Sequence, residues 1–176
     1  MASGVDKDGL PRLRAAPLPL PLHIVLVEPE IPQNTGSIAR LAAATGCVLH
    51  LVGKLGFRID AKAVRRAGLD YWPLVTVQPH ESWAEFRGAL PHARLRLLSA
   101  VASRSYLEAA FQGGDALVFG RESTGLPGEL LARHAADTFA VPTIGRVRSL
   151  NLSTVVGIVL YEALRQLGAF EKLRLE

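Results

Sequence analysis

Residues 28–40 decide the fold of this chain, and they read Glu28-Pro29-Glu30-Ile31-Pro32-Gln33-Asn34-Thr35-Gly36-Ser37-Ile38-Ala39-Arg40. They follow a continuous apolar run at residues 22–27, which is typical of a buried parallel strand. The prolines stiffen the exit from that strand, and Gly36 lets a ligand or another backbone come close. The stretch therefore predicts a strand, a tight turn and the start of a helix.

The helix after this turn is predicted to be capped by Asn34 or Thr35 and to end at Gly46. Asn34 and Arg40 lie six residues apart, close to two helical turns, so both can face one site at the helix start. Arg40 is a candidate for that site or for a surface salt bridge. The sequence contains neither a G-x-G-x-x-G motif nor a P-loop, which argues against a dinucleotide-binding or nucleotide-hydrolysing protein.

The rest of the chain alternates between strands and helices. Further strands are predicted at residues 48–52, 74–77, 95–100, 116–119 and 138–141, and further helices at residues 60–66, 127–134 and 152–166. Asn151 caps the last helix, whose wide apolar face comprises Leu152, Val155, Val156, Val159, Leu160, Ala163 and Leu167. The alternation predicts an α/β fold, a single domain with a mostly parallel sheet flanked by helices.

Length and composition set the domain organisation. At 176 residues and 49% hydrophobic, the chain fits one domain with a sizeable core. Residues 1–21 are predicted to be a flexible, proline-rich arm, because they hold six glycines and prolines. This arm is either a disordered leader or a basic segment that contacts RNA. The domain is expected to span residues 22–170, and residues 171–176 form a carboxyl-terminal tail.

The charge of the chain permits a nucleic-acid partner without requiring one. The formal net charge is +4 and the isoelectric point is near 9.6. Sixteen of the twenty basic residues are arginine. Arginine is the better planar fork for phosphate, but a GC-rich genome would produce the same bias. Both explanations stay open at this stage.

Several classes of protein can be set aside. A single cysteine, Cys47, excludes an intramolecular disulfide and a cysteine-based zinc cluster. The five histidines are scattered without metal-ligand spacing, so we expect no metal. Because the sequence has no signal peptide and no apolar run of about 18 residues, we expect a soluble, cytoplasmic protein without a membrane span.

A second motif follows the strand predicted at residues 116–119 and reads Gly120-Arg121-Glu122-Ser123-Thr124-Gly125-Leu126-Pro127. Two glycines around a charged pair, at the carboxyl end of a parallel strand, indicate a loop that binds a ligand. The carboxylate of Glu122 would repel an RNA phosphate. We therefore expect Glu122 to orient Arg40 or Arg121 or to face a cation, unless it is a solvated carboxylate of the turn.

A third motif joins the strand predicted at residues 138–141 to the last helix. It reads Val141-Pro142-Thr143-Ile144-Gly145-Arg146-Val147-Arg148-Ser149-Leu150-Asn151-Leu152-Ser153. Helix amino termini favour anions, which suits a site that contains arginines. Asn151 and Ser153 belong to this site or serve only as helix caps, and the two arginines bind the ligand or are solvated.

These three motifs, in this order, resemble those of the SPOUT methyltransferases. The resemblance covers nearly all of residues 22–168 and is greatest for the small single-domain enzymes that methylate the ribose 2′-oxygen of the wobble cytidine or uridine of tRNA. Residues 65–71 and 161–163 are also typical of that group. It implies S-adenosyl-L-methionine as methyl donor, S-adenosyl-L-homocysteine as product, a deep trefoil knot in the carboxyl-terminal part, and a homodimer whose sites use both subunits.

The resemblance also assigns roles to residues. It implies that Arg40 is the catalytic arginine, with Asn34, Glu122, Ser149 and Asn151 as its companions. It places the cofactor, largely through backbone groups, at Leu98, Gly120, Val141, Ser149 and Leu150. From their charge, we expect two arginine pairs to hold phosphates of the anticodon loop, Arg65 with Arg66 and Arg146 with Arg148.

The implied reaction is a displacement at a methyl carbon, in which alignment of the reactants supplies most of the catalysis. Because arginine is effectively always protonated, Arg40 is expected to bind the substrate phosphate and polarise the hydroxyl rather than to act as the base. Other hypotheses are methylation of another tRNA site or of ribosomal RNA, and a non-catalytic, knotted RNA-binding protein.

Overall fold

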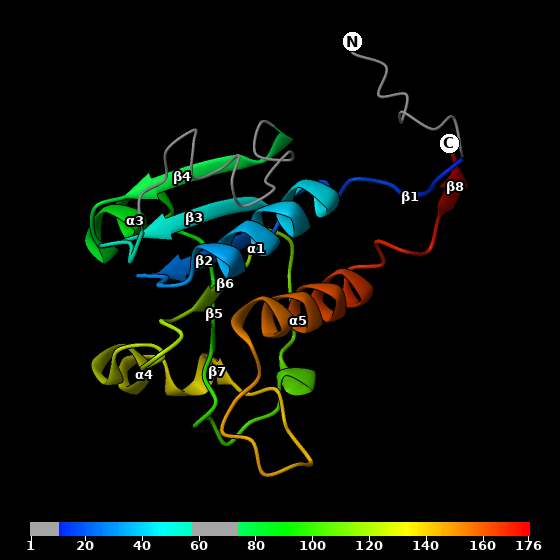
Figure 1. Ribbon diagram of the computed structural model, residues 1–176. Helices are drawn as coiled ribbons and strands as arrows, with labels where there is room; N and C mark the ends of the chain where they lie inside the picture. The colour runs from blue at the N-terminus through cyan, green and yellow to red at the C-terminus, as the bar shows by residue number, and fades with distance from the viewer. Residues whose placement is uncertain (1–10, 58–73) are drawn as a thin grey trace.

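The computed structural model describes residues 11–57 and 74–176, and within them a six-stranded parallel sheet has the order β4-β3-β2-β6-β5-β7 (Figure 1). Its strands are β2 (His23–Val27), β3 (Val48–Val52), β4 (Thr76–His80), β5 (Leu95–Leu98), β6 (Ala116–Phe119) and β7 (Thr138–Phe139). The helices are α1 (Pro32–Thr45), α3 (Trp83–Ala89), α4 (Gly128–Arg133) and α5 (Leu152–Gln166), and β1 (Leu13–Ala15) pairs with β8 (Leu173–Leu175). The predicted α/β architecture is confirmed.

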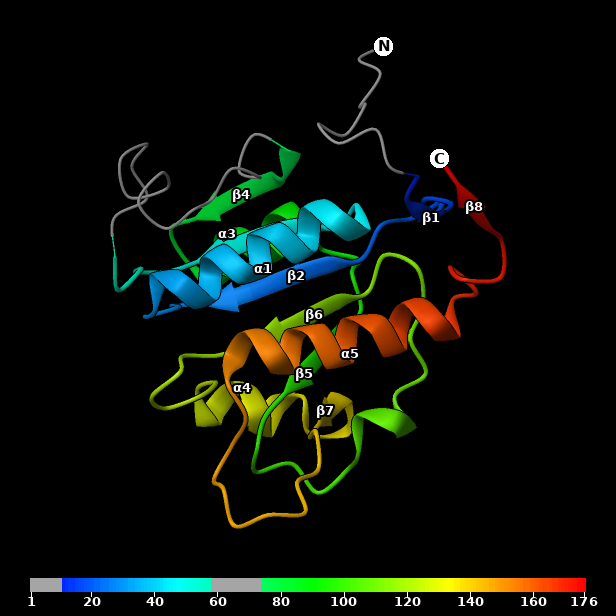
Figure 2. The same ribbon diagram turned by 45° about the vertical axis from the view of Figure 1, so that its right-hand side comes forward.

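Helices cover both faces of the sheet. Helices α1 and α5 lie side by side on one face, and α3 lies on the other (Figures 1 and 2). Side chains alternate along a strand, so Ile24 and Leu26 of β2 join the core under α1 and α5, whereas Val25 and Val27 join the core under α3. The apolar face predicted for the last helix is largely confirmed, because Val156, Val159, Leu160 and Ala163 are fully buried.

The edge strand β4 differs from the prediction. The expected strand at residues 74–77 lies at Thr76–His80, and Pro79 stands opposite Leu51 of β3 in the parallel register. A proline gives no hydrogen bond to the sheet, but it is tolerated in an edge strand such as β4. The strands predicted at residues 95–100 and 138–141 are shorter than expected, ending at Leu98 and Phe139.

Helix α3 was not predicted, although its signal stands in the sequence. Ser82 accepts a hydrogen bond from the backbone N–H of Glu85 at 3.2 Å, and the Glu85 carboxylate accepts one from the N–H of Glu81. The Ser82-x-x-Glu85 spacing is that of a capping box. The helix is only seven residues long, so its apolar periodicity is too brief to stand out. The helix predicted at residues 60–66 lies outside the described residues.

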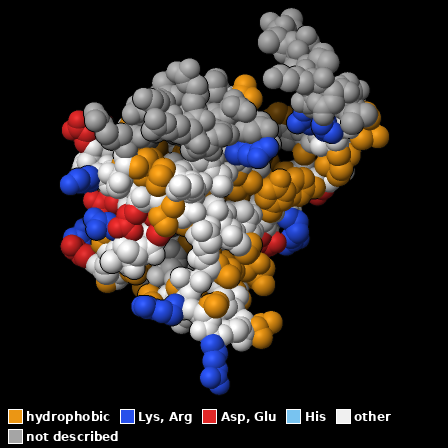
Figure 3. All heavy atoms as spheres, viewed as in Figure 1, with side chains coloured by type: hydrophobic (Ala, Val, Ile, Leu, Met, Phe, Trp, Pro, Cys, Tyr) orange, Lys and Arg blue, Asp and Glu red, His pale blue; other side chains and the backbone are white. Residues whose placement is uncertain are grey.

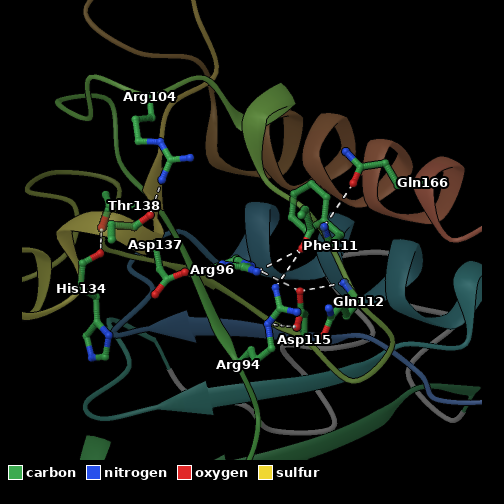
Figure 4. A network of polar contacts seen from close by, with 12 residues as sticks. Arg94, Arg96, Arg104, Phe111, Gln112, Asp115, His134, Asp137, Thr138 and Gln166 are labelled. Atoms are coloured by element: carbon green, nitrogen blue, oxygen red, sulfur yellow. Dashed lines mark hydrogen bonds and ion pairs between the residues drawn. The ribbon is translucent and has the colours of Figure 1, made fainter.

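An ion network around the buried Asp115 and Arg96 joins β5 and β6 at their amino-terminal ends (Figure 4). Asp115, just before β6, pairs with Arg94 at 3.4 Å and with Arg96 at 3.4 Å, and Arg96 also pairs with Asp137. Burial raises the pKa of the Asp115 carboxyl, opposed by the hydrogen bond from the Gln112 N–H and by Arg94. Since partners surround both Asp115 and Arg96, this network stabilises the fold and lies at the edge of the sheet opposite the three motifs.

The histidine row is a second polar group, formed by the half-buried His23 and the buried His50 and His80 on strands β2, β3 and β4. His23 Nδ1 lies 3.0 Å from His50 Nε2, and His50 Nδ1 lies 2.9 Å from His80 Nε2. The His50 and His80 rings pack edge-on against Phe86 of α3. Burial, followed by the charges of its two neighbours, lowers the pKa of His50 to about 3, so the central imidazole of the row is neutral near pH 7.

Candidate active site

The loops that follow β2, β3 and β6 meet at the carboxyl-terminal edge of the sheet. After β2, Glu28 takes a left-handed backbone conformation with φ 51°, and its N–H donates to Val52 O of β3 at 2.8 Å. A Cβ on Gly53 would lie 2.8 Å from Glu28 Cγ, and one on Gly56 would lie 2.8 Å from Glu30 Cα. These two glycines therefore let the loop after β3 pack against the turn that carries the first motif.

The loop after β6 folds back on itself. Arg121 and Gly125 exchange backbone hydrogen bonds of 3.1 and 2.9 Å. A Cβ on Gly120 would lie 2.1 Å from the carbonyl carbon of Gly125, so this position requires glycine for the closure of the loop itself. Closure directs Glu122 toward the start of α1.

The side chains of the three motifs meet in an amide relay, formed by Glu122, Asn34 and Asn151. Asn34 Nδ2 donates to Glu122 Oε1 at 2.9 Å, and Asn151 Nδ2 donates to Asn34 Oδ1 at 2.9 Å. Asn151 Oδ1 accepts from the N–H of Ser153 at 2.9 Å. A carboxylate only accepts hydrogen bonds, so it fixes the orientation of the Asn34 amide, which in turn fixes that of Asn151. The relay therefore runs in one direction.

Glu122 also binds the turn just before helix α1. Its carboxylate accepts hydrogen bonds from the backbone N–H groups of Glu30, at 2.8 Å, and Ile31, at 3.2 Å. The prediction that Asn34 or Thr35 caps this helix is wrong: Pro32 occupies the first helical position and Ile31 the cap, so Asn34 is already inside the helix. A negative charge in this place is favoured by the helix dipole. The predicted cap at Asn151 is confirmed.

Two acidic residues of the turn after β2 hold the loop after β6, and we did not identify them from the sequence. Glu28 pairs with Arg121, whose Nε lies 2.7 Å from the carboxylate, so the expected contact of Glu122 with Arg121 is replaced by this one. Glu30 accepts from the Ser123 hydroxyl at 2.9 Å and its N–H at 3.0 Å, and these bonds lower the pKa of the Glu30 carboxyl. The sequence carries a signal for these contacts, because the two carboxylates of Glu28-Pro29-Glu30 match the two hydrogen-bond donors of Arg121-Glu122-Ser123.

The residues expected to hold the cofactor lie along one edge of the sheet. Leu98 ends β5, in register with Phe119 of β6 and Phe139 of β7, so Leu98, Gly120 and Val141 lie at or just after the carboxyl-terminal ends of three adjacent strands. Leu98 is buried, while Val141 and Leu150 are half-buried and Ser149 is exposed. Apolar side chains suit an adenine ring, and backbone groups at strand ends can bind its polar edge. These positions therefore fit an adenosine cofactor.

The expected RNA-binding arginines are placed only in part. Arg146 and Arg148 are exposed in the segment 142–149, which projects from the domain between β7 and α5 (Figure 2). Arg40 is exposed on α1, whereas Asn34 on the same helix is buried in the relay. Arg65 and Arg66 lie outside the described residues. Within residues 11–57 and 74–176, no group of His, Cys, Asp and Glu forms a metal site, and no helix is long and apolar enough to cross a membrane.

Residues 21–161 match a family described as SpoU rRNA methylase. The chain belongs to the SpoU methylase family. A protein of Saccharophagus degradans named tRNA (cytidine(34)-2′-O)-methyltransferase is 46% identical over 147 residues, which are 83% of this chain and 96% of that protein. The sequence prediction of a SPOUT methyltransferase is thereby confirmed.

Solved structures of similar fold support the same family. One, described as giving structural insights into the 2-OH methylation of C/U34 on tRNA, is 53% identical with a TM-score of 0.80, covering 85% of this chain and 97% of that one. The SpoU methyltransferase AviRb of Streptomyces viridochromogenes, in complex with AdoMet, is 25% identical with a TM-score of 0.69, covering 92% of this chain and 64% of that one. A methyl donor of this kind is therefore implied for the SpoU fold seen here.

Proposed function

We propose that this chain transfers a methyl group from S-adenosyl-L-methionine to the ribose 2′-oxygen of the wobble nucleotide, position 34, of tRNA, which is cytidine or a modified uridine. One observation carries the proposal. The three motifs meet in one hydrogen-bonded relay at the edge of the sheet, in a chain whose match covers 96% of a relative that is named for this activity. The product is S-adenosyl-L-homocysteine, and the tRNA substrate suggests that the enzyme works in the cytoplasm.

The cofactor, when bound, supplies an electrophilic methyl group, which the ribose 2′-oxygen takes as the sulfur keeps the electron pair of the broken bond. Leu98, Gly120 and Val141, with Ser149 and Leu150, hold the adenosine at the ends of β5, β6 and β7. The amide relay fixes where these loops stand relative to α1. Catalysis then comes mainly from alignment of the two reactants, which is worth about 7–11 kcal/mol in favourable cases.

Arg40 binds the phosphate beside the reacting ribose and polarises its hydroxyl. A guanidinium donates hydrogen bonds and accepts none, so the proton of the hydroxyl passes to water as the O–CH3 bond forms. Arg146 and Arg148, and Arg65 with Arg66, hold further phosphates of the anticodon loop. RNA loops present splayed nucleotides that a protein can reach, which suits one exposed ribose as the substrate.

We also propose a homodimer whose sites are completed by the second subunit, and a deep trefoil knot around the loops after β6 and β7. The dimer is supported by apolar side chains exposed near the carboxyl-terminal end of α5, where Tyr161 and Phe170 stack at 5.6 Å and are 49% and 36% exposed. Figure 3 shows hydrophobic side chains gathered over this part of the molecule. Sedimentation that gives a monomer at micromolar concentration would exclude the dimer.

The decisive experiment maps 2′-O-methyl groups in total tRNA from a deletion strain after incubation with the enzyme and S-adenosyl-L-methionine. We expect one new methyl group, at nucleotide 34. Methylation confined to a D-loop or to ribosomal RNA would replace the wobble assignment with another RNA target. Binding of tRNA without any methyl transfer would favour the non-catalytic RNA-binding hypothesis. Mass spectrometry of the purified protein for bound S-adenosyl-L-methionine or S-adenosyl-L-homocysteine separates these outcomes early.

A further inference from the structure

The two ends of the described chain form a small ribbon beside the domain. Strand β1 pairs with β8 in antiparallel register, and Arg12 and Glu176 exchange backbone hydrogen bonds of 2.6 and 2.9 Å. This terminal ribbon, β1 with β8, stands apart from the six-stranded sheet, beyond the end of α5 (Figures 1 and 2). Two strands alone are marginally stable in water, so the stability of the ribbon depends on what its two faces contact.

The terminal ribbon is amphipathic. Residues directly opposite each other in an antiparallel pair share one face, and neighbours along a strand alternate between faces. The register therefore gives one apolar face and one basic face. The apolar face comprises Leu13, Ala15, Leu173 and Leu175, and the basic face comprises Arg12, Arg14 and Arg174 together with Glu176. Figure 3 shows hydrophobic and basic side chains side by side at this end of the molecule.

Two arginines stand directly opposite each other on the basic face. Arg14 pairs with Arg174 in the register, two residues along from the hydrogen-bonded pair of Arg12 and Glu176. Hydrogen-bonded and non-hydrogen-bonded pairs alternate along an antiparallel ladder, so Arg14 and Arg174 form the next hydrogen-bonded pair, with Cα atoms about 5.5 Å apart. The two arginines therefore lie on one face of the ribbon. Arginines placed in this way can bind neighbouring phosphates of a nucleic acid.

The charge of the ribbon favours a polyanion. Residues 11–15 and 171–176 carry four cationic side chains, namely Arg12, Arg14, Lys172 and Arg174, against Glu171 and Glu176. This excess of two positive charges is half of the +4 of the whole chain. Arg12 and Arg14 lie two residues apart, a step of about 6.6–6.8 Å along a strand, which is similar to the spacing of neighbouring phosphates in RNA. Arginine forks bind phosphate through two parallel hydrogen bonds.

We propose that the basic face of the terminal ribbon binds the sugar–phosphate backbone of the tRNA substrate, away from the nucleotide that is methylated. This inference rests on the proposed function. Phosphate contacts position a nucleic acid and carry no sequence information. The ribbon therefore raises the affinity for tRNA without changing which nucleotide is methylated.

The test uses the full chain with Arg14→Glu, which places a carboxylate directly opposite Arg174, a cross-strand pair of opposite charge that favours strand pairing. The variant loses two units of positive charge. Its control is Arg104→Gln with Arg133→Gln, which removes two charges from exposed side chains elsewhere on the domain. Binding of unmodified tRNA is measured from 50 to 300 mM KCl (roughly the range in which phosphate contacts dominate), together with the kinetics of methylation and the oligomeric state.

Arg14→Glu should reduce the slope of log affinity against log salt by about 1.4, the value for a loss of two positive charges that neutralise phosphates of single-stranded RNA. The KM for tRNA should rise by about tenfold at the lower salt, while kcat and the affinity for S-adenosyl-L-methionine stay within twofold. Arg174→Gln should give about half of this change in slope, and the control double variant little change.

A slope for Arg14→Glu equal to that of the control, in an enzyme that still methylates tRNA, would overturn the ribbon proposal and leave the proposed function intact. A change in oligomeric state without a change in slope would overturn it in favour of a contact between copies of the chain. If the unmodified enzyme fails to bind tRNA at all, both proposals fall.

Discussion

The amide relay and the histidine row solve the same structural problem in different parts of one sheet. Each links side chains from three separated parts of the sequence by hydrogen bonds of about 2.9–3.0 Å. The relay begins at a carboxylate that only accepts hydrogen bonds, and its amides do not titrate. In the row each neutral imidazole can donate from either nitrogen, so the direction of its bonds is not fixed by the residues themselves.

This difference predicts which network depends on pH. A proton added to His50 would place a charge among buried rings beside Phe86, which is why the pKa of this imidazole falls to about 3. Nothing equivalent applies to Asn34 or Asn151. The row links strands β2, β3 and β4 through the buried His50, whereas the relay keeps a fixed polarity in the loops of the proposed site.

Acid should produce the largest effect. The pKa of His50 is about 3 in the folded state, against 6.5 for an unperturbed histidine, so below pH 6.5 the unfolded chain binds a proton that the folded chain does not. The stabilisation by this group is complete above pH 6.5 and is lost as the pH falls toward 3, by about 1.4 kcal/mol for each pH unit. His23, whose pKa is also lowered by burial, acts in the same direction.

The unfolding free energy is measured by urea denaturation between roughly pH 4 and pH 8, the range in which proton binding by the unfolded chain changes the stability. His50→Gln keeps a donor and an acceptor but does not titrate, so the slope of unfolding free energy against pH should become much smaller. Substituting the exposed His92 by Gln serves as the control and should leave the slope unchanged. An unaltered slope in His50→Gln would show that the acid sensitivity comes from other groups, such as the buried Asp115.

Arg40 comes next in expected size. Arg40→Ala should reduce methyl transfer by on the order of 10²–10³-fold, the usual loss when a group that stabilises a developing charge is removed. The affinity for S-adenosyl-L-methionine should stay within a few-fold, because the proposed cofactor positions lie at the ends of β5 and β6 and in the loop after β7. Arg40→Lys should also be poor, since lysine lacks the planar fork. Calorimetry that shows loss of cofactor binding in Arg40→Ala would place this residue in the cofactor site instead.

Asn34→Leu would cut the amide relay in the middle. It leaves Glu122 Oε1 and Asn151 Nδ2 without this partner, at a cost of about 1–3 kcal/mol in unfolding free energy. We expect activity to fall through misplaced loops, while the pH dependence of stability follows that of the unmodified protein. Asn34→Asp offers a matched comparison, because it sets a second carboxylate against Glu122 and should destabilise more at pH 8 than at pH 5. A similar loss at both pH values would contradict the assigned direction of the relay.

The sequence predicted the parts of the fold that depend on neighbours along the chain. Strand β2, the stop of α1 at Gly46 and the cap of α5 by Asn151 follow from local periodicity and cap chemistry. The three motifs also pointed to one edge of the sheet. The partner of Asn34 could not be predicted, because Glu122 lies 88 residues away and its orientation depends on how a loop closes over Gly120.

Pairing of the chain ends was beyond prediction for the same reason. Strand β1 begins just after Pro11 and Arg12, and β8 is three residues long, so neither stands out by periodicity. The row of His23, His50 and His80 likewise arises only when three parallel strands align in register. Contacts across the sheet are set by register and topology, which a single sequence specifies through its whole core rather than through any one segment.

The smallest effect is expected from the amino-terminal arm, which neither network involves. Residues 11–17 are exposed, but Leu18 packs against the core and Leu20 lies against Gly113. Deleting residues 1–17 should therefore leave the melting temperature nearly unchanged, although β8 loses its partner strand. Deleting residues 1–21 should cost about 1 kcal/mol through the lost contacts of Leu18 and lower the melting temperature by about 2–4 °C. Scanning calorimetry of both truncations decides the point: a much larger drop for the shorter deletion would mean that the terminal ribbon stabilises the domain and does more than hold RNA.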